Sequence, residues 1–96
     1  MSAPVPITHN IAASRFETTV DGLLCVADYR LAGSTMTLFH TEVPAGLAGR
    51  GIAAALVAEA LAHARRQGWH VRPTCSYVAS YMQRHPETLD LLEPAA

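Results

Sequence analysis

The chain has 96 residues, of which 50% are hydrophobic and 16% charged, and its formal net charge at pH 7 is -1. A chain of this length supports one hydrophobic core, so we expect a single domain. The seven Lys and Arg residues are scattered from Arg15 to Arg84 without a basic block, which argues against nucleic acid as a partner.

The N-terminal segment MSAPVPITHN has neither a basic start nor an apolar stretch of signal-peptide length. No later segment approaches the ~20 apolar residues of a membrane span, so we expect a cytosolic (cytoplasmic) protein with no membrane partner. Two prolines predict a flexible leader over residues 1–6, followed by one domain over residues 7–96. The two cysteines, Cys25 and Cys75, are interpreted as lone thiols, because so few cysteines do not make a disulfide framework.

Three antiparallel strands are predicted before Pro44. Asp21 and Gly22 form a hairpin-turn signal between the first two strands, and Ala32–Ser34 is a second turn signal. The following segment, TMTLFHTEV, alternates, which is typical of a half-buried strand. Strict alternation places these residues on one side of that strand: Met36, Leu38, His40 and Glu42.

From about Gly49 the apolar period becomes helical, and the stripe consists of Ile52, Leu56, Val57, Ala60, Leu61 and Ala64. Gly68 is the expected C-terminal stop. WHVRP then predicts a strand, and SYVASYMQRH a second helix that ends at Pro86. The tail ETLDLLEPAA is expected either to hold one more helical turn or to fray. The order β-β-β-α-β-α predicts an α+β (mixed α/β) fold.

The predicted start of the first helix has no side-chain cap. No Ser, Thr, Asp or Asn occurs between Val43 and Glu59, and no acidic residue lies in the same interval. One interpretation is a site for an external anion, which Gly49 and Gly51 allow to approach the backbone. The alternative is that water satisfies these N–H groups and the glycines make a tight turn. A dinucleotide site is disfavoured, because no Asp or Glu lies ~20 residues further on.

The segment VPAGLAGRGIAAALVAEAL resembles the acyl-CoA pyrophosphate loop of the GNAT (GCN5-related N-acetyltransferase) superfamily, whose usual form is Arg/Gln-x-x-Gly-x-Gly/Ala. Gly51 and Ala53 match its last two named positions, whereas Ala48 stands where Arg or Gln is usual. Three further stretches resemble small stand-alone GNAT-like proteins, and with the loop they extend the resemblance to Glu87: HTEVP, the spaced set Pro73, Cys75, Val78 and Tyr81, and RHPE.

This resemblance implies a reduced GNAT fold, an antiparallel meander followed by helix, strand and helix. It implies binding of acetyl-CoA and transfer of acetyl to an unidentified small-molecule or peptide amine. The residues implied to hold the cofactor are Val43, Ala48, Gly49, Arg50, Gly51, Ile52 and Ala53, with Arg50 partly replacing the charge missing at Ala48. A non-catalytic CoA-binding module is the alternative, since the short Asp21–Gly22 turn leaves no room for the helical segment that normally builds an acceptor wall.

Amine acetylation needs a base for the acceptor and an acid for the departing thiolate. Glu42 and His40 are candidates for the base, or else solvated strand residues. Cys75 precedes the second helix, where it is a candidate nucleophile or a small buried residue. Tyr81 is the candidate acid that the resemblance favours over Tyr77, with packing on the sheet as the alternative. The spacing of His and Cys gives a metal site little support.

Overall fold

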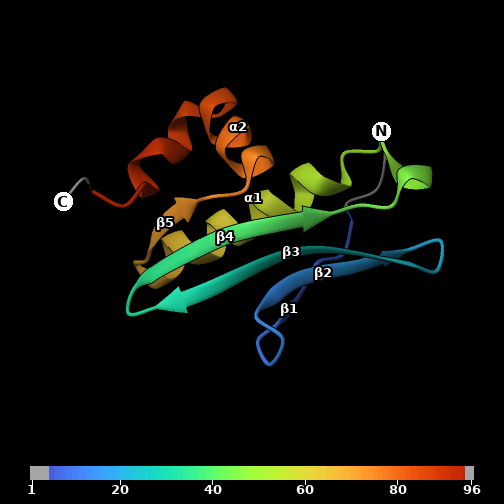
Figure 1. The fold of residues 1–96 in the computed structure, drawn as a ribbon, viewed down its shortest axis with the longest axis horizontal. Helices are drawn as coiled ribbons and strands as arrows, with labels where there is room; N and C mark the ends of the chain where they lie inside the picture. The colour runs from blue at the N-terminus through green and yellow to red at the C-terminus, as the bar shows by residue number, and fades with distance from the viewer. Residues whose placement is uncertain (1–4, 95–96) are drawn as a thin grey trace.

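The computed structural model describes residues 5–94 of the chain. Its centre is one five-stranded sheet in the order β1-β2-β3-β4-β5 (Figure 1). The first four strands are antiparallel neighbours, and β5 is parallel to β4. The strands span Thr8–Asn10 (β1), Arg15–Val20 (β2), Leu23–Ala32 (β3), Thr35–Glu42 (β4) and His70–Pro73 (β5).

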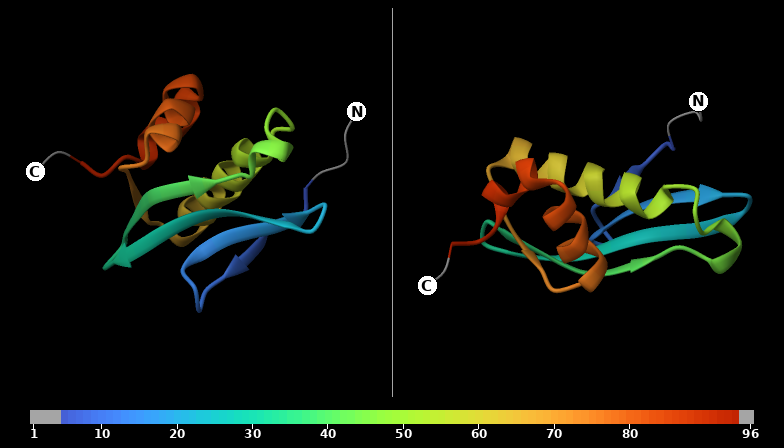
Figure 2. Two further views of the ribbon diagram at one scale, coloured as in Figure 1. Left: turned by 45° about the vertical axis from the view of Figure 1, so that its right-hand side comes forward. Right: turned by 90° about the horizontal axis from the view of Figure 1, so that it is seen from above.

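Two α-helices and two short 3-10 helices complete the fold of residues 5–94. A parallel pair of strands needs a crossover connection, and α1 (Ile52–Gln67) supplies it between β4 and β5. Figure 2 shows α1 running along one face of the sheet, and α2 (Ser76–Arg84) follows β5 and contacts β4, β5 and α1. The 3-10 helices are η1 (Ala45–Leu47), before α1, and η2 (Pro86–Leu91), after α2.

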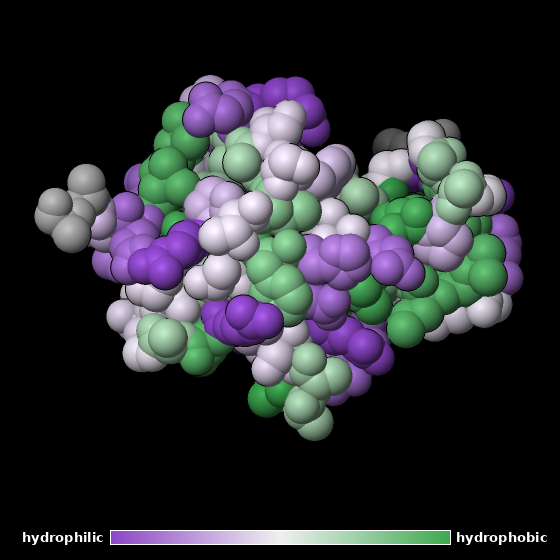
Figure 3. All heavy atoms as spheres, in the orientation of Figure 1, coloured by the Kyte–Doolittle hydropathy of each residue, from purple (hydrophilic) through white to green (hydrophobic). Residues whose placement is uncertain are grey.

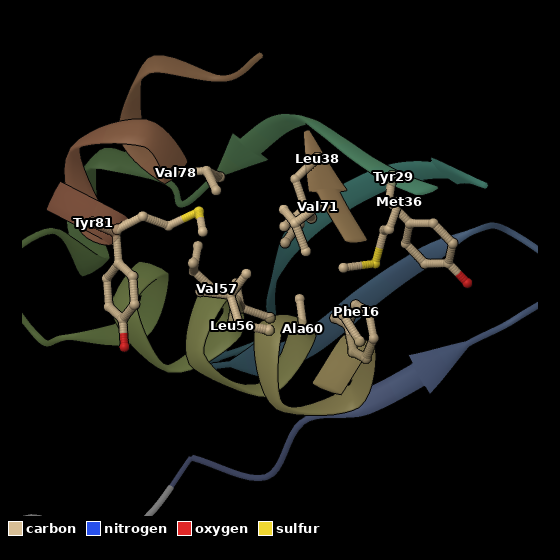
Figure 4. Packing of buried hydrophobic residues seen from close by; sticks show 14 of the residues in the cluster. Phe16, Tyr29, Met36, Leu38, Leu56, Val57, Ala60, Val71, Val78 and Tyr81 are labelled. Carbon is tan, nitrogen blue, oxygen red and sulfur yellow. The ribbon is translucent and has the colours of Figure 1, made fainter. Parts of the chain in front are cut away.

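The hydrophobic core lies between the sheet and α1. The predicted apolar stripe of α1 is confirmed, because all of its six residues are buried. A two-residue period on the strands supplies the opposite wall. Figure 4 shows the facing side chains, among them Phe16, Met36, Leu38 and Val71 from the sheet and Leu56 and Ala60 from α1.

A β-bulge in β4 interrupts the predicted alternation of that strand. Tyr29 pairs with Leu38 and Asp28 pairs with His40, so Phe39 has no partner on β3. A bulge of one residue reverses the faces beyond it. The prediction that His40 and Glu42 share a side with Leu38 is therefore wrong: both lie on the face opposite the core, and their neighbour Thr41 takes the core side.

The structure near the two ends of the chain adds to what was predicted from the sequence. The strand β1 was not predicted, and Val5, within the expected leader, packs against the core. Residues 1–4 of that leader lie outside the described residues. The extra helical turn in the tail is confirmed as η2, after which Glu93 donates a backbone hydrogen bond to Val71 of β5.

None of the helices formed by residues 5–94 combines the length and the apolar character required to cross a bilayer.

Candidate functional site

The strands β4 and β5 diverge at the bulge. Their pairing ends at Leu38 and Pro73, although β4 continues to Glu42 with β3 as its partner (Figure 1). The last backbone–backbone hydrogen bond across this pair is donated by the Cys75 N–H to the Leu38 carbonyl, at 3.1 Å. Beyond it, one edge of β4 has no neighbouring strand.

The loop after β4 reaches α1 through two glycines with left-handed backbone angles. Gly49 has φ 82° and Gly51, the residue before α1, has φ 78°. A Cβ atom added at either position would meet no atom within 4 Å. The loop therefore needs glycine there for its backbone conformation and not for lack of space.

The start of α1 offers a row of free backbone donors. Among residues 5–94, no hydrogen bond uses the N–H groups from Gly49 to Ala54, and the first to be used in α1 is that of Ala55, which donates to the Gly51 carbonyl at 3.0 Å. No side chain caps the helix and no acidic residue lies in its first turn. The positive end of the helix dipole is therefore open to an anion.

A cavity of ≈ 310 Å³ lies beside these donors. Its size is at the lower end of the range for small-molecule sites. It is lined by Val43, Leu47, Ala48, Gly49, Gly51, Ile52, Ala53, Ala54 and Tyr77. The predicted cofactor-binding residues thus gather around one cavity, with the exception of Arg50, whose guanidinium instead contacts the Asp21 carboxylate at 3.0 Å.

Cys75 is half-buried immediately before α2, close to the point where β4 and β5 separate. Its Sγ lies 3.6 Å from the hydroxyl oxygen of Thr41 on β4. Burial raises the pKa of the Cys75 thiol, but hydrogen bonds from the backbone of Val78, the Thr41 hydroxyl and the backbone of Tyr77 outweigh it, so this pKa is below its ordinary value. Cys25, in contrast, is fully buried, and burial raises its pKa.

His40 and Glu42 form an exposed pair on the outer face of the sheet. The His40 Nε2 atom lies 3.2 Å from a carboxylate oxygen of Glu42. Neither residue lines the cavity. The strand thus brings these two candidate bases together on the opposite face from the core.

The two tyrosines of α2 lie at different cavities. Tyr77 lines the cavity at the start of α1. Tyr81 lies in a second cavity of ≈ 170 Å³ between α1 and η2, with its ring stacked on His85 at 4.1 Å between centroids. Burial, with a smaller contribution from Glu87, raises the pKa of Tyr81. The structure thus places Tyr77, and not the sequence candidate Tyr81, beside the loop.

A family model described as GCN5-related N-acetyl-transferase matches residues 15–91. The chain belongs to the GCN5-related N-acetyltransferase (GNAT) family. It is 30% identical over 98 residues to Protein NATD1 of Xenopus tropicalis, a match that covers 97% of this chain and 90% of that protein. It is likewise 30% identical over 96 residues to Protein NATD1 of Mus musculus, covering 95% of this chain and 87% of that one.

The GNAT fold is also that of a solved structure. A GCN5-like protein from Staphylococcus aureus, whose solution structure was solved by NMR, superimposes with a TM-score of 0.75 at 19% sequence identity. The match covers 99% of this chain and 94% of that one. The mixed α+β architecture predicted from the sequence is therefore confirmed.

Several residues of this candidate site were not predicted from the sequence. Leu47 and Ala54 line the cavity as plain apolar residues, which carry no signal in a single sequence. Thr41 reaches Cys75 because of the bulge, which depends on how β4 pairs with β3. Within residues 5–94, no group of three or more His, Cys, Asp or Glu side chains is arranged to hold a metal ion.

Proposed function

We propose that this GNAT protein binds acetyl-CoA at the start of α1 and transfers the acetyl group to a primary amine. The observation that carries the proposal is the row of N–H groups from Gly49 to Ala54, which donate to no acceptor among residues 5–94 and lie beside the cavity. A helix N-terminus with free N–H groups and glycines suits a pyrophosphate.

The remaining features of the cavity fit the rest of the cofactor. Val43, Leu47 and Ile52 give it an apolar lining, which suits a pantetheine arm. The unpaired edge of β4 beyond Leu38 offers backbone groups to the amides of that arm. Acetyl-CoA supplies the thioester, and the thioester end would lie in the gap between β4 and β5, near Cys75 and Thr41.

The reaction needs one proton removed and one supplied. The acceptor nitrogen attacks the thioester carbonyl carbon, the carbon–sulfur bond breaks, and the acetyl group becomes an amide. We assign removal of the amine proton to the Glu42–His40 pair, through water, and protonation of the departing CoA thiolate to the Tyr77 hydroxyl. In this assignment Tyr81 is a packing residue between α1 and η2.

The role of Tyr77 is tested by removing a single oxygen atom. We expect Tyr77→Phe to lower kcat about 10- to 100-fold while leaving the dissociation constant of acetyl-CoA within about twofold, because the ring that lines the cavity is kept. Tyr81→Phe is the matched control and should leave kcat nearly unchanged. Equal losses in the two variants, or a loss confined to Tyr81→Phe, would contradict the assignment.

Binding at the start of α1 is tested by placing a charge in the first turn of the helix. Ala53 lines the cavity there. We expect Ala53→Asp to weaken acetyl-CoA binding at least 10-fold in calorimetry, because the carboxylate repels the pyrophosphate and competes for its donors. The same carboxylate should raise the free energy of unfolding by about 0.3–1 kcal/mol through the helix dipole.

The isosteric variant Ala53→Asn separates charge from size. It should bind acetyl-CoA much more tightly than Ala53→Asp does. If wild-type protein releases or absorbs no heat at millimolar acetyl-CoA, and thermal unfolding does not respond to the ligand, the proposed binding is wrong.

A non-catalytic acetyl-CoA-binding module is the second candidate. It is favoured by one observation: His40, Glu42 and Cys75 are all absent from the cavity lining. Release of free CoA thiol that requires an added amine identifies the transferase. Binding without thiol release over a broad amine panel identifies the module.

Cys75 allows a third route, in which the acetyl group first moves to its sulfur. In that route the Cys75 thiolate attacks the thioester carbonyl carbon, the bond from this carbon to the CoA sulfur breaks, and the CoA thiolate takes up the proton that Cys75 had lost. The amine then attacks the acetyl-cysteine, the Cys75 thiolate leaves, and the amine nitrogen loses its proton. Intact mass after incubation with acetyl-CoA distinguishes the routes: an acetyl adduct that is lost in Cys75→Ala identifies the covalent step, and its absence during turnover identifies direct transfer.

A further inference from the structure

Arg50 lies within the loop that we assign to the pyrophosphate, between the left-handed residues Gly49 and Gly51. It is nevertheless not part of the cavity lining. Its guanidinium Nη1 atom contacts the Asp21 Oδ2 atom at 3.0 Å, and this is the only ion pair that Arg50 makes within residues 5–94. The arginine within this row of free N–H groups is thus paired with a carboxylate of the chain itself.

Asp21 is held in place by the turn that joins β2 and β3. Asp21 and Gly22 both have left-handed backbone angles, with φ of 52° and 76°, as a tight two-residue hairpin requires. The turn residues are therefore fixed by the pairing of two strands, whereas Arg50 projects from a loop. Of the two side chains, that of Arg50 is therefore the one that can move away from the ion pair.

The ion pair is weak enough to be exchanged. The two side chains are 51% and 63% exposed, and exposed ion pairs of this kind contribute little to stability because water and salt screen them. The surface beside it is apolar at Leu23 and Leu24, which are also exposed, and Figure 3 shows hydrophobic residues gathered at this end of the molecule. A pyrophosphate bound to the loop would carry more negative charge than one carboxylate and would compete for the guanidinium.

We propose that Asp21 lowers the affinity of the loop for acetyl-CoA by holding Arg50, and that the bound pyrophosphate takes Arg50 from Asp21, an inference that rests on the acetyl-CoA binding proposed above. Two effects act in the same direction. The carboxylate neutralises the loop's arginine in the free protein, and its own charge repels an incoming phosphate. Asp21 is thus an affinity-determining residue outside the cavity.

The test is a double-mutant cycle in calorimetry with Asp21→Asn and Arg50→Gln. We expect Asp21→Asn to tighten acetyl-CoA binding roughly two- to fivefold at low salt, and this gain should shrink as the salt concentration rises. Arg50→Gln should weaken binding, and by a larger factor in the Asp21→Asn background than in wild type, because Arg50 is then fully available to the ligand.

A structural role for the ion pair gives a different pattern. If Asp21 only anchors the loop, Asp21→Asn loosens acetyl-CoA binding, or leaves it unchanged, and the two substitutions add independently; either result overturns the proposal. The increase in affinity caused by Asp21→Asn should be the same for 3′-dephospho-CoA, which keeps the pyrophosphate. An increase that is seen only for CoA with its 3′-phosphate overturns the assignment to the pyrophosphate. Failure of wild type to bind acetyl-CoA at all would instead reject the proposed function.

Discussion

At the scale of single residues, the contact between Cys75 and Thr41 joins the two strands that separate at the site. One partner follows β5 and the other lies on β4, on the core side of the bulge. The hydroxyl and the backbone N–H groups at the start of α2 stabilise the thiolate, which lowers the pKa of the Cys75 thiol below its ordinary value. The reactivity of Cys75 therefore depends on the geometry of the gap between β4 and β5. This holds whether the acetyl group passes through Cys75 or moves directly to the amine.

We expect Thr41→Val to raise the pKa of the Cys75 thiol, because it removes one hydrogen bond to the sulfur and keeps the size of the side chain. Alkylation by iodoacetamide, followed by mass spectrometry as a function of pH, would measure the shift. Thr41→Ser should retain the wild-type profile. Cys25 serves as an internal control, since a fully buried thiol should stay unmodified in the folded protein. An identical profile in wild type and Thr41→Val would show that the hydroxyl does not act on the sulfur.

At the scale of elements, the loop between β4 and α1 depends on its backbone angles. Gly51 has φ 78°, a conformation that costs other residues about 1–2 kcal/mol. Gly46 in η1 is not among the positive-φ residues, and a Cβ atom at either position meets open space. The two glycines thus differ in conformation and not in crowding.

We therefore expect Gly51→Ala to lower the free energy of unfolding by about 1–2 kcal/mol in urea denaturation, whereas Gly46→Ala should change it by less than about 0.5 kcal/mol. Equal effects of the two substitutions would mean that strain at Gly51 is relieved by movement of the loop.

The elements that were predicted from the sequence are those with a strong local pattern. The stripe of α1 and the turn at Asp21–Gly22 each depend on residues close together in the chain, and both are confirmed. The strand β1 has only three residues, too few for a period to show. The bulge at Phe39 arises from pairing between two strands, so alternation within β4 could not reveal it.

The candidate site likewise has features that are local in the sequence and features that depend on the tertiary fold. The free N–H groups and the glycines are local properties of one segment, and they were predicted. The partner of Arg50 lies 29 positions away in the sequence, and Tyr77 reaches the cavity from another helix. Contacts of this kind are set by the tertiary fold and leave no pattern in a single sequence.

At the scale of the whole molecule, a cluster of aromatic rings packs β1 against β2 and α1. The imidazole of His9 stacks on Phe16 at 4.2 Å between centroids, lies 4.5 Å from the ring of His63 on α1, and contacts the Tyr29 hydroxyl at 2.7 Å. Burial lowers the pKa of His9, His63 lowers it further, and Glu59 opposes them with a smaller effect. The folded protein therefore binds a proton at His9 less readily than the unfolded chain does.

This shift predicts a loss of stability on mild acidification. As the pH falls below about 6.5, the unfolded chain takes up a proton that folded His9 does not, and the free energy of unfolding decreases until His9 in the folded state is also protonated. Urea denaturation between pH 7.5 and 5 should show this decrease, and His9→Gln should reduce its slope.

The carboxyl groups with lowered pKa, Glu17 and Asp90, act in a separate range. Hydrogen bonds from Arg15 and Arg65, respectively, are the main cause of these two shifts. The stability that these two carboxyl groups contribute is present above about pH 4.5 and is lost at more acidic pH, so its pH range does not overlap with that of His9.

The prediction for His9 can therefore be tested without interference from the carboxyl groups. A wild-type free energy of unfolding that stays constant from pH 7.5 to 5.5 would contradict the role of His9.

The segment after η2 covers the outer edge of β5. Leu92 forms a parallel bridge with Val71, the Glu93 N–H donates to the Val71 carbonyl, and the Glu93 carboxylate pairs with Arg72. An open edge strand is a template for a strand from another chain. By occupying this edge of β5, the segment blocks edge-to-edge aggregation there with a few residues of irregular chain.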